Sequence, residues 1–333
     1  MTTATDEHRG ADSEETNRTA FGLALRIDPR IEITGLGHGP ELQPAAPSAP
    51  PSRVRLDGDE LERRWRALTT QPARMRELRF GQTPLLTVDF AEPAGYLLWA
   101  AEFGRVLISP DGLELLCEPD PANPDWASIL AAQALPLAAT IRGLEVFHAS
   151  GVVLDGRALL FAGPPGAGKS SLAAAFLRIG GRLLSDDAVA LWLSEGALTA
   201  HAGSVALQLR EDEDRRLSAD ARAALGYRAG PALGKQRYVS EGVPGPAPLG
   251  CLFLIERSGE GPAVEPLAAA NPFELIASTF NLSVRTPARL QHQLDVVSAI
   301  ASGGLAHRLR VQPEVDATGL ASIVAAQPAV AAG

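Results

Sequence analysis

Lysine is almost missing from this chain of 333 residues. Of its 30 basic residues only two are lysine, Lys169 and Lys235, and the others are arginine. We interpret this bias as a consequence of genome composition. Arginine does not replace lysine where a compact and mobile ammonium group is needed. The lysines that remain therefore mark positions where lysine chemistry is expected.

Cysteine is also scarce, with Cys117 and Cys251 as the two examples. Two cysteines are too few for a disulfide framework or for a metal site made of thiolates. We expect both to be ordinary buried residues in a protein of a reducing compartment.

Long apolar runs and dense basic stripes are missing as well. No segment approaches the 18 uncharged apolar residues of a membrane helix, and the net charge of -9 repels nucleic acid. The first 20 residues are polar and acidic, unlike a secretory signal or a transit peptide. With 46% hydrophobic residues and a mean hydropathy of +0.03, the composition predicts a folded, soluble, cytoplasmic protein with no membrane or nucleic-acid partner. It is compatible with a homo-oligomer.

The hydropathy pattern divides the chain near residue 145. Before it, period-two alternation and a turn at Pro110-Asp111-Gly112 predict an antiparallel sheet, interrupted by a Pro/Gly/Ala-rich linker at 35–52. After it, strand, loop, helix and strand patterns follow one another. We therefore predict an α/β fold with a smaller β-rich N-terminal module. The expected segments are a disordered tail (1–20), the β-rich module (21–120), a connecting helix bent or split at Pro136 (121–145), a P-loop domain (146–312) and a C-terminal helix and tail (313–333).

One segment fits the phosphate-binding pattern G-x4-G-K-[ST] in full. It reads Gly163, Pro164, Pro165, Gly166, Ala167, Gly168, Lys169, Ser170, and Ser171 follows. The glycines let backbone N–H groups surround a phosphate, the lysine adds a cation and the first serine offers a hydroxyl to Mg²⁺. The alternative is a chance Gly-rich turn. An apolar strand before the loop and a helix after it favour phosphate binding.

Two adjacent carboxylates, Asp186 and Asp187, follow the apolar residues Leu183 and Leu184. An isolated Asp-Asp is more often an Asx turn that closes a strand. One crossover after a P-loop, however, the pair is expected near the bound phosphates. Neighbouring residues of a strand face opposite sides, so one carboxylate is expected at Mg²⁺ and the other at an acceptor hydroxyl.

Two further features have an ordinary and a functional interpretation. His148 lies in a strand-like run, where a histidine is more often a hydrogen-bonded core residue than a catalytic one. The run from Lys235 to Tyr238 follows a Gly/Pro-rich loop. It is either a grip for the acceptor or the γ-phosphate, or a solvated turn.

About 45 residues, from His148-Ala149-Ser150-Gly151 through the P-loop to Gly180-Gly181-Arg182 and Asp186-Asp187, resemble the catalytic domain of bacterial HPr kinase/phosphorylase. The layout is similar to the wider group of HPr-kinase-like proteins, some of which phosphorylate precursor peptides in lasso-peptide clusters. This resemblance implies a P-loop kinase core related to phosphoenolpyruvate carboxykinase, which uses ATP and Mg²⁺ to phosphorylate a serine.

By position, the resemblance implies that Lys169 and Ser170 bind phosphate and Mg²⁺. It places Asp186 near the acceptor and Asp187 at the metal, with His148 orienting the carboxylates. The chain lacks the family's later E-x-R-G-x-G-type signature and an obvious basic substrate loop. Phosphorylase activity and HPr as the substrate are therefore not expected.

The function predicted is that of an ATP-dependent serine kinase acting on a peptide or small protein. Two alternatives stay open at this point: an ATP-binding regulator that transfers nothing, and a kinase of small molecules. The pair of carboxylates favours a kinase, because a switch needs one metal carboxylate whereas transfer also benefits from a carboxylate at the acceptor.

Overall fold

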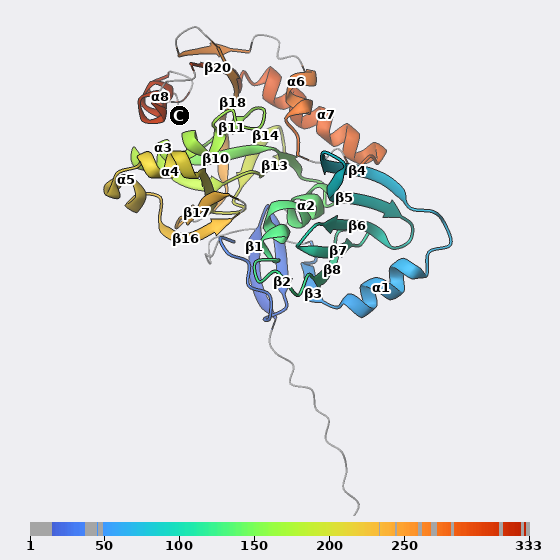
Figure 1. Cartoon of the computed structure of the whole chain (residues 1–333). Coiled ribbons are helices and arrows are strands. Elements are labelled where there is room, and N and C mark those ends of the chain that lie inside the picture. The colour runs from blue at the N-terminus through green and yellow to red at the C-terminus, as the bar shows by residue number, and fades with distance from the viewer. Residues whose placement is uncertain are drawn as a thin grey trace, which may run out of the picture.

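The computed structural model describes residues 15–36, 45, 49–232, 234–243, 245–258, 262–267, 272–280, 283–312, 316–327 and 330. Their strands form three sheets (Figure 1). The tail predicted for residues 1–20 is wrong at its end, because Thr16–Ala20 form a strand paired with Leu23–Ile27. Residues 1–14 and most of the predicted linker at 35–52 lie outside the described residues.

The first sheet has the strand order β1-β2-β3-β8-β7-β6-β5-β4. Its strands from β4 to β8 are antiparallel neighbours, as the alternation predicted. Helix α1 (Gly58–Arg66) covers part of it, capped by Asp57, whose carboxylate accepts the Glu60 N–H. The strands are β1 Thr16–Ala20, β2 Leu23–Ile27, β3 Ser52–Leu56, β4 Ala73–Phe80, β5 Thr83–Ala91, β6 Gly95–Ala100, β7 Gly104–Ile108 and β8 Glu114–Pro119.

The connecting helix is present but split. A π-helical turn, η1 (Leu130–Ala134), runs into α2 (Leu135–Ile141). Pro136 stands in the first turn of α2, where its missing N–H costs least. The Leu135 N–H donates to the Leu130 carbonyl five residues back, so the helix changes hydrogen-bond pattern just before the proline.

The second sheet has nine strands, with the path β12-β10-β11-β18-β14-β13-β9 and with β20 and β19 beyond β18. Strand β10 is antiparallel to both β11 and β12, so β11 and β12 run parallel with β10 between them. Their carboxyl ends therefore meet at one edge. The strands are β9 Glu145–Phe147, β10 Ala149–Leu154, β11 Arg157–Ala162, β12 Arg182–Ser185, β13 Val189–Ser194, β14 Ala197–His201, β18 Ala247–Arg257, β19 Ala263–Pro266 and β20 Ala306–Val311.

Helix α3 (Lys169–Arg178) joins β11 to β12 and packs on α8 (Ala317–Ala325), while α7 (Pro287–Ser302) and α6 (Pro272–Ala277) pack together near β13 and β14. Among the described residues, no helix is both long and apolar enough to cross a membrane.

A third, small sheet has the order β15-β17-β16 (β15 Ala206–Arg210, β16 Tyr227–Ala232, β17 Lys235–Val239). The solvated turn considered for 235–238 is therefore wrong, because these residues form its central strand and Gln236, Arg237 and Tyr238 are buried. Between β15 and β16 the chain forms two short helices, α4 (Glu211–Arg216) and α5 (Ala219–Ala223).

The two large sheets share one hydrophobic core. Leu98 and Val106 of the first sheet belong to the same buried cluster as Val146 and Ala190 of the second. Backbone hydrogen bonds also join the segments of the two sheets. For example, the Phe21 N–H donates to the Ala202 carbonyl at 2.7 Å. The β-rich module and the region that contains the P-loop are therefore packed together through a common core.

Candidate active site

The P-loop lies between the end of β11 and the start of α3. Gly163, Gly166 and Gly168 have φ values of 154°, 79° and 101°, in the left-handed region that residues with a Cβ avoid. Gly168 is the N-cap of α3 and offers no capping side chain. The first backbone N–H groups of α3 are therefore available to an anion at the positive end of the helix.

Lys169, the first residue of α3, folds back over this loop. Its Nζ donates to the Gly163 carbonyl at 3.0 Å and to the Pro164 carbonyl at 3.4 Å. Burial lowers the pKa of Lys169, and the nearby carboxylates of Asp187 and Asp186 act in the opposite direction. When a phosphate binds to the loop, the Lys169 ammonium can donate to its charged oxygens instead of to the neutral carbonyls, and such hydrogen bonds are stronger.

Asp186 lies beside the P-loop, at the carboxyl end of β12. Its Oδ1 accepts the hydroxyl of Ser170 at 3.0 Å and that of Ser150 at 2.5 Å, and its Oδ2 accepts the Gln208 N–H at 3.0 Å. The side chain is buried, and this burial together with Asp187 raises the pKa of Asp186 to about 6. Three donors fix the orientation of a carboxylate that touches the P-loop serine.

Asp187 does not continue the strand. β12 ends at Ser185, and Asp187 has a φ of 65° while the Ala188 N–H donates to the Asp186 carbonyl. The expectation that the two carboxylates alternate along a strand is therefore wrong. The pair stands on a tight turn, and the hydrogen bond to Ser170 is made by Asp186 rather than by the expected Asp187. Asp187 is half-buried and its charge acts on Lys169 and His148.

His148 stands in the break between β9 and β10 and contacts the backbone of Asp187. Its Nδ1 lies 2.9 Å from the Asp187 carbonyl, which only accepts, so Nδ1 carries the proton and donates. Burial and the positive charge of Lys169 lower the pKa of His148. The imidazole N–H of His148 therefore holds the left-handed turn that presents Asp187.

These residues fit a nucleotide with Mg²⁺. Within the described ranges, no group of three or more His, Cys, Asp and Glu side chains is arranged to hold a metal. Mg²⁺ at nucleotides needs fewer protein ligands, commonly one or two, and takes the rest from phosphate and water. The Ser170 hydroxyl and the Asp186 carboxylate are such a donor pair, next to a helix N-terminus without a capping side chain.

The other predicted contacts are placed differently. The hydroxyl of Ser171 donates to Glu213 at 2.8 Å and is thereby directed at α4. Arg237 pairs with Asp125 at 2.9 Å, which ties β17 to the segment before η1. Lys235 is near enough to the P-loop for its charge to lower the pKa of Lys169.

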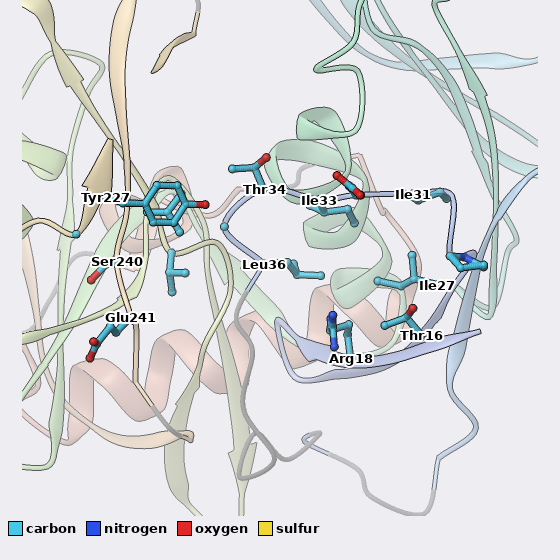
Figure 2. A pocket seen from close by; sticks show the side chains of 16 residues that line it. Thr16, Arg18, Ile27, Ile31, Ile33, Thr34, Leu36, Tyr227, Ser240 and Glu241 are labelled. Atoms are coloured by element: carbon cyan, nitrogen blue, oxygen red, sulfur yellow. The ribbon is translucent and has the colours of Figure 1, made fainter. Parts of the chain in front are cut away.

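Two cavities flank this region. One, of about 390 Å³, begins at the P-loop residues Ala167, Gly168 and Ser171 and extends between α3 and α8, with Arg257 at its wall. The other, of about 760 Å³, lies between the segment 27–36 and strands β16 and β17, and Figure 2 shows the exposed Tyr227 at one side of it. No P-loop residue, Asp186, Asp187 or His148 lines this larger cavity, so we do not count it as part of the site.

The sequence interpretation missed the role of two residues. Ser150 was part of the recognised segment, but nothing in its spacing indicated a bond to Asp186. Gln208 contacts Asp186 through its backbone N–H, and such a contact cannot be recognised from the type of side chain. Both become visible only when β10 and β15 are placed beside the end of β12.

Comparisons with known proteins find similarity among solved structures. No family model and no curated protein matches the chain. Among solved structures, the HPr(Ser) kinase/phosphatase from Coxiella burnetii is similar over 54% of this chain and 93% of its own, with 16% sequence identity and a TM-score of 0.28. Because that score is low, the assignment of function rests on the site itself.

Proposed function

We propose that this chain is an ATP-dependent kinase that transfers the γ-phosphoryl group to a serine hydroxyl of a peptide or small protein. The observation that carries the proposal is the 3.0 Å hydrogen bond from Ser170 of the P-loop to the buried Asp186, with a second carboxylate, Asp187, on the adjoining turn. One carboxylate serves the metal and leaves the other for the acceptor.

In this proposal Ser170 and Asp186 hold Mg²⁺, and Lys169 binds the β- and γ-phosphates. The ion, when bound, neutralises the negative charge that develops on the phosphate oxygens. Asp186 is suited to this role because Ser150 and the Gln208 N–H keep its carboxylate in one orientation. This assignment exchanges the roles that the resemblance implied for the two aspartates.

Asp187 in turn takes the acceptor side. The oxygen of the acceptor hydroxyl forms a bond to the γ-phosphorus, the bond from that phosphorus to the β,γ-bridging oxygen breaks, and the hydroxyl proton passes to the Asp187 carboxylate. The products are the phosphate ester and ADP. His148 acts through the backbone of Asp187 and is a positioning residue in this scheme.

The nucleoside end of ATP is assigned to the 390 Å³ cavity that starts at the P-loop. Its wall combines apolar side chains such as Leu172 and Ile255 with Arg257, which suits a planar base and a ribose. Arg257 lies against the P-loop, because a Cβ added to Gly168 would come within 3.3 Å of its Nη2, so its substitution by Ala is expected to weaken binding of both ATP and ADP.

We propose a hydroxyl group as the acceptor because Asp187, the carboxylate that does not bind the metal, is suited to accept the hydroxyl proton. That the acceptor is a serine in a peptide or small protein rests on the resemblance of residues 148–187 to HPr kinase. A kinase of small molecules would use the same carboxylates, and the choice of acceptor in the experiment separates the two.

Phosphate transfer from labelled ATP tests the proposal. The acceptors are peptides encoded by neighbouring genes, a pooled library of serine peptides and free hydroxylic metabolites. We expect label on a serine peptide with the wild type and with D212N, a carboxylate of α4 that pairs with Arg210, and about a hundredfold less label with D187N. ATP binding without transfer to any acceptor would contradict the proposal and identify a regulator.

A further inference from the structure

An arginine of the N-terminal sheet reaches the neighbourhood of the candidate active site. Arg76 belongs to β4, the edge strand of the first sheet (Figure 1). Its guanidinium lies 5.8 Å from the ring centre of Phe280, and that ring lies 6.0 Å from the ring of His148. The Phe280 N–H donates to the Val146 carbonyl at 2.6 Å. The backbone of Phe280 is therefore bonded to β9, two residues before His148.

A β-bulge turns Arg76 toward this region. In the pairing of β4 with β5, Arg74 lies opposite Asp89, whereas Arg76 lies opposite Val88. Directly opposed residues share a face of the sheet and successive residues alternate, so Arg74 and Arg76 point to opposite faces. In a regular pairing, Met75 would lie opposite Val88, and both arginines would share a face. Bulges of this kind re-aim side chains near functional sites.

Arg76 contacts neutral side chains, and among the described residues no carboxylate forms an ion pair with it. Its Nη1 donates to the amide oxygen of Gln133 in η1 at 3.3 Å, and within the described ranges no carboxylate pairs with it. Its neighbours on the strand are paired: Arg74 with Asp89, and Arg79 with Glu77. Burial lowers the pKa of the Arg76 guanidinium, with no carboxylate acting in the opposite direction. A partly buried cation of this kind is costly to maintain unless an anion joins it.

The charge of Arg76 is also felt inside the site. It lowers the pKa of His148, as the charge of Lys169 also does. Two cations therefore act on His148: Lys169 of the P-loop, which is near the carboxylates of Asp186 and Asp187, and Arg76, on which no carboxylate acts. Lys169 is explained by the nucleotide phosphates. Arg76 remains without a partner in the machinery described so far.

We propose that Arg76 binds an oxyanion of the substrate at the acceptor side of the active site, so that the N-terminal sheet contributes a binding residue to the reaction. The inference rests on the proposed function for the location of that side. The oxyanion has two sources, the γ-phosphoryl group in transfer or a carboxylate next to the acceptor serine. A planar guanidinium held by Gln133 and Phe280 suits either, because it binds two oxygens in a fixed geometry.

The test compares the wild-type full chain with R76Q, R76K and the matched control R74Q. R74Q removes an arginine of the same strand whose partner is Asp89 on the opposite face. One arm measures the affinities for Mg-AMP-PNP and Mg-ADP, since their ratio reports contacts with the γ-phosphate. The other measures binding to the Mg-AMP-PNP complex of serine peptides that carry Asp or Glu, against the same peptides with Asn or Gln.

If the oxyanion is the γ-phosphoryl group, R76Q lowers the AMP-PNP to ADP affinity ratio roughly tenfold or more, the effect of losing a charged hydrogen bond. If the oxyanion belongs to the acceptor, the AMP-PNP to ADP affinity ratio of R76Q is unchanged. The wild type then binds acidic peptides roughly tenfold or more tightly than their amide counterparts, and R76Q binds both equally. In both cases R76K is intermediate and R74Q resembles the wild type. R76Q that matches the wild type in both arms overturns the inference.

Stability separates binding from a structural role. Because Arg76 has no carboxylate partner among the described residues, R76Q is expected to keep or raise the unfolding midpoint while it loses binding. A lower midpoint with unchanged binding would contradict the inference. Should R76Q fail to fold, R76K, which keeps the charge but not the planar fork, still gives both measurements. Absence of transfer with the wild type would count against the proposed function without touching these binding comparisons.

Discussion

Ser170 and Asp186 are joined by a 3.0 Å hydrogen bond, although one begins a helix and the other follows a strand. The contact exists because β11 and β12 run parallel and end at the same edge of the sheet, so that the P-loop and the aspartate turn are neighbours. The metal site that we propose between nucleotide and protein rests on this single contact.

Removal of the P-loop cation is expected to weaken binding of ATP more than binding of ADP. K169A deletes the ammonium that now rests on the Gly163 and Pro164 carbonyls, while the backbone N–H groups of the loop remain. We expect a loss of ATP affinity of roughly tenfold or more, the usual effect of one charged hydrogen bond. Calorimetric titration measures it, and the control is R74Q, which removes an arginine of the N-terminal sheet that pairs with Asp89. Unchanged ATP affinity in K169A would count against the phosphate site.

A chain that begins at residue 122 is expected to lose cooperative folding. The hydropathy pattern predicted a β-rich N-terminal module, but Val146, Ala190 and Val284 are buried in a cluster that also contains many residues of β1 to β8. Without those strands this apolar surface faces water. Near-ultraviolet circular dichroism and thermal unfolding report the loss, and a chain from residue 15 is the control. A fragment from 122 that unfolds at the full-length midpoint would show that the module is independent.

A buried ion pair gives the protein a specific dependence of stability on pH. Glu145 accepts a hydrogen bond from Arg289 at 2.8 Å, yet burial outweighs this attraction and raises the pKa of Glu145 to about 7. The folded state thus binds the proton more tightly than the unfolded chain. The stability due to this group is complete below its ordinary pKa near 4.5 and is lost as the pH rises through about 7.

The loss amounts to at most about 3 kcal/mol, since each pKa unit corresponds to about 1.4 kcal/mol. E145Q cannot titrate, so its free energy of unfolding is expected to fall less than that of the wild type between pH 5 and pH 8. Denaturant unfolding of both proteins over this range is the measurement. Parallel curves for the two proteins would contradict the pKa assigned to Glu145.

Part of this site could be predicted from sequence because its chemistry is local. The P-loop needs glycines, a lysine and a serine at fixed spacing, and the strand and helix on either side have clear hydrophobic patterns. The apolar runs of β5 to β8 are recognisable as strands in the same way, although β6 is buried on both faces. In such segments the residue types themselves are the constraint.

The rest depends on how distant segments meet. The roles of Asp186 and Asp187 depend on a turn in which Asp187 takes a φ of 65°, and the letters Asp-Asp after a strand do not distinguish that turn from an extended chain. Arg76 is one of many arginines, and its orientation depends on a bulge near Met75. The third sheet was missed because Lys235 to Tyr238 follows a loop rich in Gly and Pro, which is typical of a turn.

The most direct measurement for the whole proposal is the affinity for ATP as a function of Mg²⁺ concentration, in the wild type, D186N and D187N. Both substitutions keep the size of the side chain and remove its charge. Because Asp186 contacts Ser170 and Asp187 does not, we expect D186N to need roughly tenfold or more Mg²⁺ for the same affinity, and D187N to follow the wild-type curve while transfer falls about a hundredfold. A wild-type curve for D186N, or a shifted curve for D187N alone, would contradict this assignment of the two carboxylates.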